Sequence, residues 1–132
     1  MNKKIKSILI PFALFFSYPA FSLTPAEIKA CYDKAMTTLA IHECANQEYS
    51  YYDKILNDTY KSLLSYLSPE GKTALVTSQK AWLDYRTKEC KLMGLQHEGG
   101  SMQAIDEIDC YNTFNKKRIQ DLKNYINSYS NQ

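Results

Sequence analysis

The sequence predicts an all-α fold, a four-helix, bundle-like antiparallel domain stapled by two disulfides. Three observations support this prediction. Apolar residues recur at steps of three and four along most of the chain. Capping residues and prolines mark the points where helices begin. Four cysteines occur in a chain whose first residues have the composition of an export signal, and the alternating pattern typical of strands is missing.

The first 22 residues are interpreted as a signal peptide. Three lysines lie among the first six residues, an apolar run follows at 8–16, and Ala20-Phe21-Ser22 supplies the small residues that signal peptidase recognises. The run is shorter than the ~20 residues that span a bilayer. We therefore predict cleavage after Ser22 and a single mature domain, residues 23–132, that is periplasmic or secreted and has no membrane span.

Cleavage changes the charge of the protein. The signal removes three of the 16 Lys and Arg residues and none of the 14 Asp and Glu residues, which leaves a net charge of −1. The basic balance of the full sequence therefore belongs to the signal. A chain with this charge offers no argument for nucleic-acid binding, so we expect none.

The mature chain holds four cysteines, Cys31, Cys44, Cys90 and Cys110. An even number in an exported chain predicts two disulfides, and three pairings are possible. We favour Cys31–Cys44 and Cys90–Cys110, because each closes a short segment across a predicted helix-loop-helix corner. Zinc is the alternative, but there is no Cys-x-x-Cys and the two histidines lie far apart in the sequence. We expect no metal and no cofactor.

Two helices are predicted in the first half of the mature chain. The first begins at a capping box formed by Thr24 and Glu27. Two threonines at 37–38 weaken its apolar pattern toward a break. The second helix is expected to open at Cys44 and to carry an apolar stripe over about residues 45–67.

Two further helices complete the predicted bundle. Ser68-Pro69 ends the second helix and caps a third, over about residues 69–93, which forms a tight antiparallel hairpin with the second. The segment 94–101 contains three glycines, which disfavour helix, so it is predicted to be a loop. The last helix is expected from near Ile105 to about Tyr129, with Arg118 on its apolar stripe.

One face of the third helix carries polar residues where a core would need hydrocarbon. Gln79 and Arg86 lie on this face beside Trp82, the only tryptophan. The alternatives are a partner inside the fold or exposure in a ligand groove. We favour the first and predict that Asp53 and Asn57 of the second helix contact the guanidinium of Arg86 across the hairpin. These five residues form the predicted structural polar cluster.

The glycine loop is the candidate contact surface. It displays His97, Glu98, Gly99, Gly100 and Ser101 in an exposed segment, where binding residues are common. A His-Glu pair could act as acid and base, but no nucleophile or orienting residue accompanies it. We therefore expect no catalytic site and no enzyme.

Four motifs lie between Cys31 and Leu122, and their polar residues occupy positions that helix periodicity does not require. The motifs are Asp53-x-x-Leu56-Asn57-x-x-Tyr60-x-x-Leu63, Leu75-x-x-x-Gln79-x-x-Trp82-x-x-x-Arg86-x-x-x-Cys90, Gly100-Ser101, and Cys110-x-x-Thr113-x-x-x-x-Arg118-x-x-x-Leu122. This pattern resembles the lysozyme inhibitor LprI-like N-terminal domain family of small exported bacterial proteins.

The resemblance implies an exported protein-binding domain with lysozyme as its partner. If inhibition holds, the segment 94–102 is the expected contact. Two other classes remain open at this point. An immunity protein that neutralises a toxin, or an envelope-assembly factor, fits the same scaffold. A peptidoglycan-acting enzyme is the third, and it would need Glu98 or Glu107 in a cleft.

Overall fold

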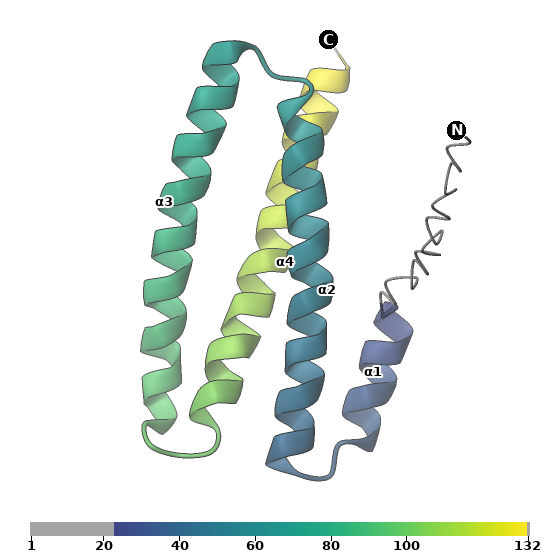
Figure 1. Ribbon diagram of the computed structural model, residues 1–132, viewed down its shortest axis with the longest axis vertical. Helices are drawn as coiled ribbons and strands as arrows, with labels where there is room; N and C mark the ends of the chain where they lie inside the picture. The colour runs from purple at the N-terminus through teal and green to yellow at the C-terminus, as the bar shows by residue number, and fades with distance from the viewer. Residues whose placement is uncertain (1–22, 132) are drawn as a thin grey trace, which may run out of the picture.

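The computed structural model describes residues 23–131 and consists of helices joined by short connections (Figure 1). The described chain contains no strand, so the predicted all-α class is confirmed. None of its helices is apolar enough along its length to cross a membrane. The predicted signal peptide, residues 1–22, lies outside the described residues. In chain order the helices are α1 (Pro25–Lys34), α2 (Thr38–Leu64), α3 (Pro69–Gly94), the 3-10 turn η1 (Leu95–His97) and α4 (Gln103–Ser130).

The predicted caps of α1 and α3 are confirmed. The backbone N–H of Thr24 donates to the carboxylate of Glu27 at 2.7 Å, and the N–H of Glu27 donates back to the Thr24 hydroxyl at 3.3 Å. These two bonds complete a capping box. At α3 the hydroxyl of Ser68 accepts from the N–H of Gly71 at 3.2 Å, and Pro69 occupies the first helical position. Local sequence therefore determines where both helices begin.

The predicted bounds of α2 are wrong at both ends. This helix begins at Thr38, nearly two turns before the expected start, because the hydroxyl of Thr37 accepts from the N–H of Ala40 at 3.1 Å and caps it. The threonines that weaken the apolar pattern thus begin a helix. At its other end α2 stops at Leu64, and residues 65–68 form the turn into α3.

α4 holds the bundle together. It packs against both α2 and α3, whereas those two helices make few direct contacts with each other, and α1 packs on α2. In Figure 1 the α1–α2 connection (residues 35–37) and the α3–α4 connection (95–102) lie at the same end of the molecule. We call this the loop end. The opposite end, with the α2–α3 turn and the last residues of α4, is the hairpin end.

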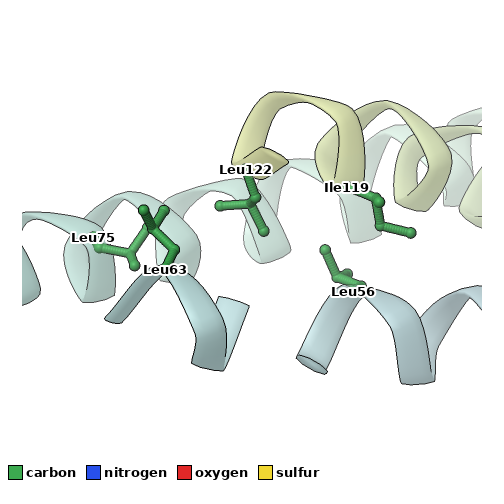
Figure 2. Packing of buried hydrophobic residues seen from close by; sticks show 5 residues of the cluster. All are labelled: Leu56, Leu63, Leu75, Ile119 and Leu122. Atoms are coloured by element: carbon green, nitrogen blue, oxygen red, sulfur yellow. The ribbon is translucent and has the colours of Figure 1, made fainter. Parts of the chain in front are cut away.

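The main apolar core lies in the half of the bundle nearer the hairpin end. Its five members come from all three long helices (Figure 2), with Leu122 fully buried. They are Leu56 and Leu63 of α2, Leu75 of α3, and Ile119 and Leu122 of α4. Burying aliphatic side chains of this size contributes roughly 1.5–3 kcal/mol each. The half nearer the loop end has no equivalent cluster among the described residues.

Disulfides connect the helices near the loop end. Cys31 of α1 is bonded to Cys44 of α2, and Cys90 of α3 is bonded to Cys110 of α4. The favoured pairing is confirmed. Cys44 and Cys90 are both buried, so the bonds take the place of core side chains at this end of the bundle.

Gly94 allows α3 and α4 to approach each other just before they separate into the loop. It is buried at the last position of α3, and a Cβ atom there would overlap with Cγ of Glu107 on α4.

We expect Gly94→Ala to lower the free energy of unfolding by about 1–2 kcal/mol, because the cost of relieving this overlap exceeds the gain of about 1 kcal/mol in helix propensity. Urea unfolding followed by circular dichroism measures the change. Combining it with Glu107→Ala should restore most of the loss, and an unrestored double variant would contradict the steric explanation.

Candidate functional site

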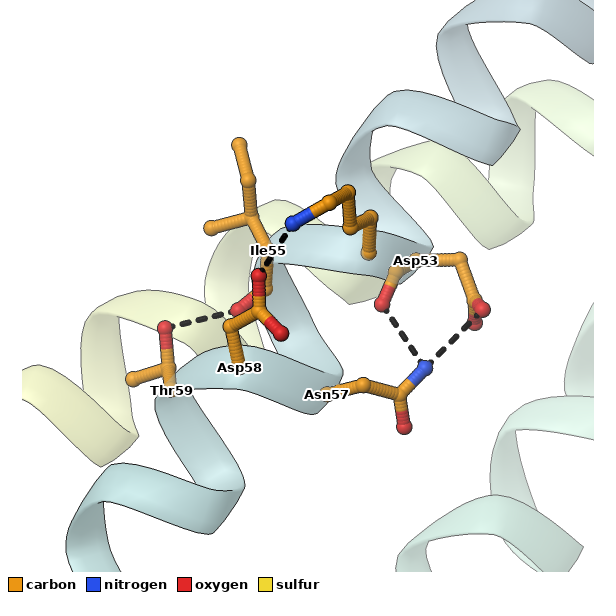
Figure 3. Close-up of polar contacts among 6 residues, drawn as sticks. Asp53, Ile55, Asn57, Asp58 and Thr59 are labelled. Atoms are coloured by element: carbon orange, nitrogen blue, oxygen red, sulfur yellow. Dashed lines mark hydrogen bonds and ion pairs between the residues drawn. The ribbon is translucent and has the colours of Figure 1, made fainter. Parts of the chain in front are cut away.

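Arg86 does not contact the residues predicted for it. Its Nη1 donates to Oδ1 of Asn115 on α4 at 2.5 Å. The amide of Asn57 instead donates to the backbone carbonyl and the carboxylate of Asp53 within α2, at 2.9 and 3.0 Å (Figure 3). The prediction of an Arg86 contact across the α2–α3 hairpin is therefore wrong. The reason is the central position of α4, which takes the face of α3 that was assigned to α2.

Gln79 and Trp82 do lie in a polar cluster, but the partner that another helix supplies comes from α4 and not from α2. The Nε of Arg118 donates to the side-chain carbonyl of Gln79 at 3.0 Å, and its Nη2 donates to Ser78 at 3.2 Å. The guanidinium carbons of Arg86 and Arg118 lie 4.8 and 5.7 Å from the ring centroid of Trp82. The indole therefore stabilises two buried cations through its ring face.

Sequence reasoning missed two buried asparagines on α4. Asn115 accepts from Arg86, and Asn112 donates to the backbone carbonyl of Ala45 on α2 at 3.2 Å. Both side chains are almost completely buried. Their spacing of three, in register with Ile119 and Leu122, was a signal that they face the core. The amides extend the polar layer from α3 through α4 to α2.

The predicted contact segment is exposed and ordered by local bonds. His97 pairs through Nδ1 with the carboxylate of Asp106 in the first turn of α4. Gly99 has a positive φ of 72°, and its N–H donates to the side chain of Gln103 at 2.9 Å. The whole range His97–Ser101 is solvent-exposed, as a contact surface requires. Among the described residues no group of three or more His, Cys, Asp or Glu side chains is placed to hold a metal ion.

Glu48 connects three helices on the side of the bundle where α1 lies. Its carboxylate accepts from the hydroxyl of Tyr32 on α1 at 2.9 Å and pairs with Lys116 of α4 at 2.6 Å. Partial burial and then the bond to Glu48 raise the pKa of Tyr32 well above its ordinary value. The pKa of the Asp109 carboxyl is raised, first by partial burial and then by the negative charges of Glu48 and Asp106. Carboxylates are therefore concentrated near the loop end.

Apolar side chains are also exposed at the loop end. Met36 is 90% exposed and Leu39 is 68% exposed at the α1–α2 corner. Leu95 and Met102, in the α3–α4 connection, are exposed as well. A hollow of about 390 Å³ joins the two corners and is lined by Thr38, Leu39, His42, Ser101 and Ala104. Exposed apolar groups gathered at one place are typical of a protein contact surface.

The fold separates charges that the sequence mixes. When the long helices are divided at their midpoints, the half that contains the loop end (residues 25–51 and 82–116) carries ten carboxylates and six Lys or Arg residues. The other half (52–81 and 117–131) carries four carboxylates and seven Lys or Arg residues. The mature chain, whose net charge is −1, therefore has an acidic loop end and a basic hairpin end.

Comparisons with known proteins identify the family of this chain. A sequence model of the family described as lysozyme inhibitor LprI matches residues 29–122. An uncharacterized protein of Rhizobium meliloti is 30% identical over 111 residues, covering 74% of this chain and 80% of its own length. The uncharacterized protein YecT of Escherichia coli is 29% identical over 103 residues, covering 67% of this chain and 64% of its own. No solved structure matches. The family match covers most of the chain, which therefore belongs to the lysozyme inhibitor LprI family.

Proposed function

We propose that this chain is an exported protein-binding domain that inhibits lysozyme through its loop end. The observation that carries the proposal is the coincidence of exposed apolar residues and excess carboxylates on one end of a rigid bundle. Apolar groups supply affinity at the centre of an interface, and surrounding charges orient and accelerate the approach of a partner of opposite sign. Lysozymes of the host type are basic, so they fit this surface. Family membership supports the same partner.

Export also belongs to this proposal. Disulfides persist in oxidising compartments, and each of the two bonds here joins two different helices. The expected cleavage after Ser22 leaves α1 intact, because its capping box begins at Thr24. Periplasmic or secreted location would place the domain where it meets an incoming lysozyme.

Binding explains the loop end better than catalysis does. His97 and Asp106 form an exposed pair, and no serine, cysteine or threonine is bonded to that histidine among the described residues. Glu107 lies against Gly94 and accepts from Gln103 at 3.4 Å, so its carboxylate is oriented within the fold. The cavity of about 490 Å³ that Glu107 lines has no second carboxylate among its lining residues, whereas glycoside hydrolysis requires two.

A titration tests the proposal directly. Increasing amounts of the oxidised mature chain, residues 23–132, are added to lysozyme acting on peptidoglycan, and the rate of lysis is measured. We expect saturable inhibition that weakens as ionic strength rises, because part of the attraction is between the acidic loop end and a basic enzyme. An unchanged rate at a large molar excess would reject lysozyme as the partner. Lysis by the chain alone would instead indicate an enzyme.

A further inference from the structure

A second cavity lies above the loop end, between α2 and α3 over α4. It has a volume of about 490 Å³, within the range of small-molecule sites. Tyr49 of α2 and Tyr111 of α4 form one wall, with ring centroids 6.0 Å apart in an edge-to-face arrangement. Arg86 and Thr87 line it from α3. The cavity exists because α4 separates the two helices and their side chains do not fill the space near the loop end.

Arg86 is a buried cation without a carboxylate partner. It is 7% exposed, yet it lines the cavity and lies 5.1 Å from the ring of Tyr111, another lining residue. It forms no ion pair with any described residue, and its Nε has no hydrogen-bond partner there. Asn115 accepts from Arg86 through its Oδ1, but its Nδ2 has no acceptor. The guanidinium of Arg86 therefore has one donor without an acceptor and no negative charge to offset its own.

A carboxylate is the anion that matches this arrangement. The guanidinium presents its donors in a planar fork that pairs with both oxygens of a carboxylate. The other lining groups include the two tyrosine rings, the hydroxyl of Thr87, the amide of Asn46 and the imidazole of His42. Such walls accept a neutral body attached to the carboxylate.

Glu107 limits the charge that a ligand can carry. It also lines the cavity, but its side chain lies against Gly94, about two turns along α3 from Arg86. It forms no ion pair with Arg86. Its carboxylate repels negative charge on the rest of any ligand that enters the same cavity. A ligand with a single carboxylate is therefore favoured over a polyanion.

We propose that this cavity binds a small ligand, or the end of a chain, that carries one carboxylate, with the carboxylate paired to Arg86. A peptide C-terminus and a sugar acid are the two sources that share this chemistry. The proposal does not rest on lysozyme inhibition, because Arg86 is not part of the exposed apolar surface, although the hollow at the loop end shares His42 and Ala104 with this cavity.

Calorimetric titration of the oxidised mature chain tests the proposal, and the fluorescence of Trp82 locates the event, because its ring lies 4.8 Å from Arg86. The probes are N-acetyl-trialanine with a free C-terminal carboxylate, the same peptide with an amidated C-terminus, and glucuronic acid. Titration to about 20 mM saturates even a contact of millimolar affinity. We expect saturable binding of at least one carboxylate probe. A response to the free peptide alone identifies a chain end, and a response to glucuronic acid alone identifies a sugar acid.

Three variants separate the role of Arg86 from a general effect on the fold. Arg86→Lys keeps a cation and a donor for Asn115 but loses the fork, and we expect at least tenfold weaker binding. Thr87→Phe fills the cavity from an exposed position of α3 and should abolish binding with Arg86 intact. Lys88→Ala removes an exposed cation that pairs with Asp84, and it should bind as the wild type does. Each variant is first checked for an unchanged helical spectrum.

Three results would overturn the assignment. The first is an absence of saturable binding by both carboxylate probes. The second is equal binding of the free and amidated peptides, which would show that the carboxylate is not recognised. The third is unaltered binding by Thr87→Phe, which would place the ligand outside the cavity.

Discussion

Replacing Cys90 and Cys110 with alanine is expected to lower the free energy of unfolding by about 3 kcal/mol, because the bond closes a segment of 20 residues in the unfolded chain. For a domain of this size the loss corresponds to a melting temperature lower by roughly 12 °C. Within residues 23–131, the half of the bundle near the loop end has no large apolar cluster to compensate. Alanine is the appropriate replacement, because Cys90 is fully buried and a serine hydroxyl would lack a partner. Urea unfolding and thermal melts followed by circular dichroism measure the effect.

The matched control is the double alanine variant of Cys31 and Cys44. This bond closes 13 residues, so the same entropy argument gives a similar value in principle. α1, however, packs mainly on α2, and we expect it to detach locally while the three long helices stay folded. Amide hydrogen exchange should then increase over residues 25–37, with a smaller change in the main melting transition. An equal loss from both variants would contradict this division of the fold.

The sequence was most informative where a structure depends on neighbouring residues. The caps of α1 and α3 follow from Thr24, Glu27 and Ser68 within one turn, and each was predicted correctly. The start of α2 was not, because a Ser or Thr that interrupts an apolar pattern can either break a helix or cap one. Only the position of Ala40 relative to Thr37 distinguishes these outcomes, and that position is a property of the folded backbone.

The partner of Arg86 shows where local reasoning ends. Helix periodicity correctly placed this residue on the inner face of α3, but two helices compete for that face. The choice between Asp53 of α2 and Asn115 of α4 depends on how the long helices pack, which is set by contacts far apart in the sequence. The separation of charge has the same origin. Carboxylates from α1, α2, α3 and α4 meet at the loop end only after the antiparallel order is established.

Replacing Met36 and Leu39 with lysine is expected to weaken lysozyme inhibition by at least 100-fold. Both side chains are exposed at the loop end, so the free protein loses no core contact. In a complex each would lose an apolar anchor worth about 1–2 kcal/mol, and together 2.7 kcal/mol corresponds to a 100-fold change in affinity. The two added cations also oppose approach to a basic enzyme. The concentration that gives half-maximal inhibition is measured for each protein at constant lysozyme.

Tyr66 and Tyr129 provide the control, because both are exposed aromatic residues in the half of the bundle at the hairpin end. Their double lysine variant adds the same charge and removes comparable apolar surface at the opposite pole. Full inhibition by this control, together with unchanged melting temperatures of both proteins, assigns the loss to the loop end. If the hairpin-end variant were the one to lose inhibition, the binding surface would lie at the basic pole, and attraction between an acidic surface and a basic enzyme would not explain the interaction.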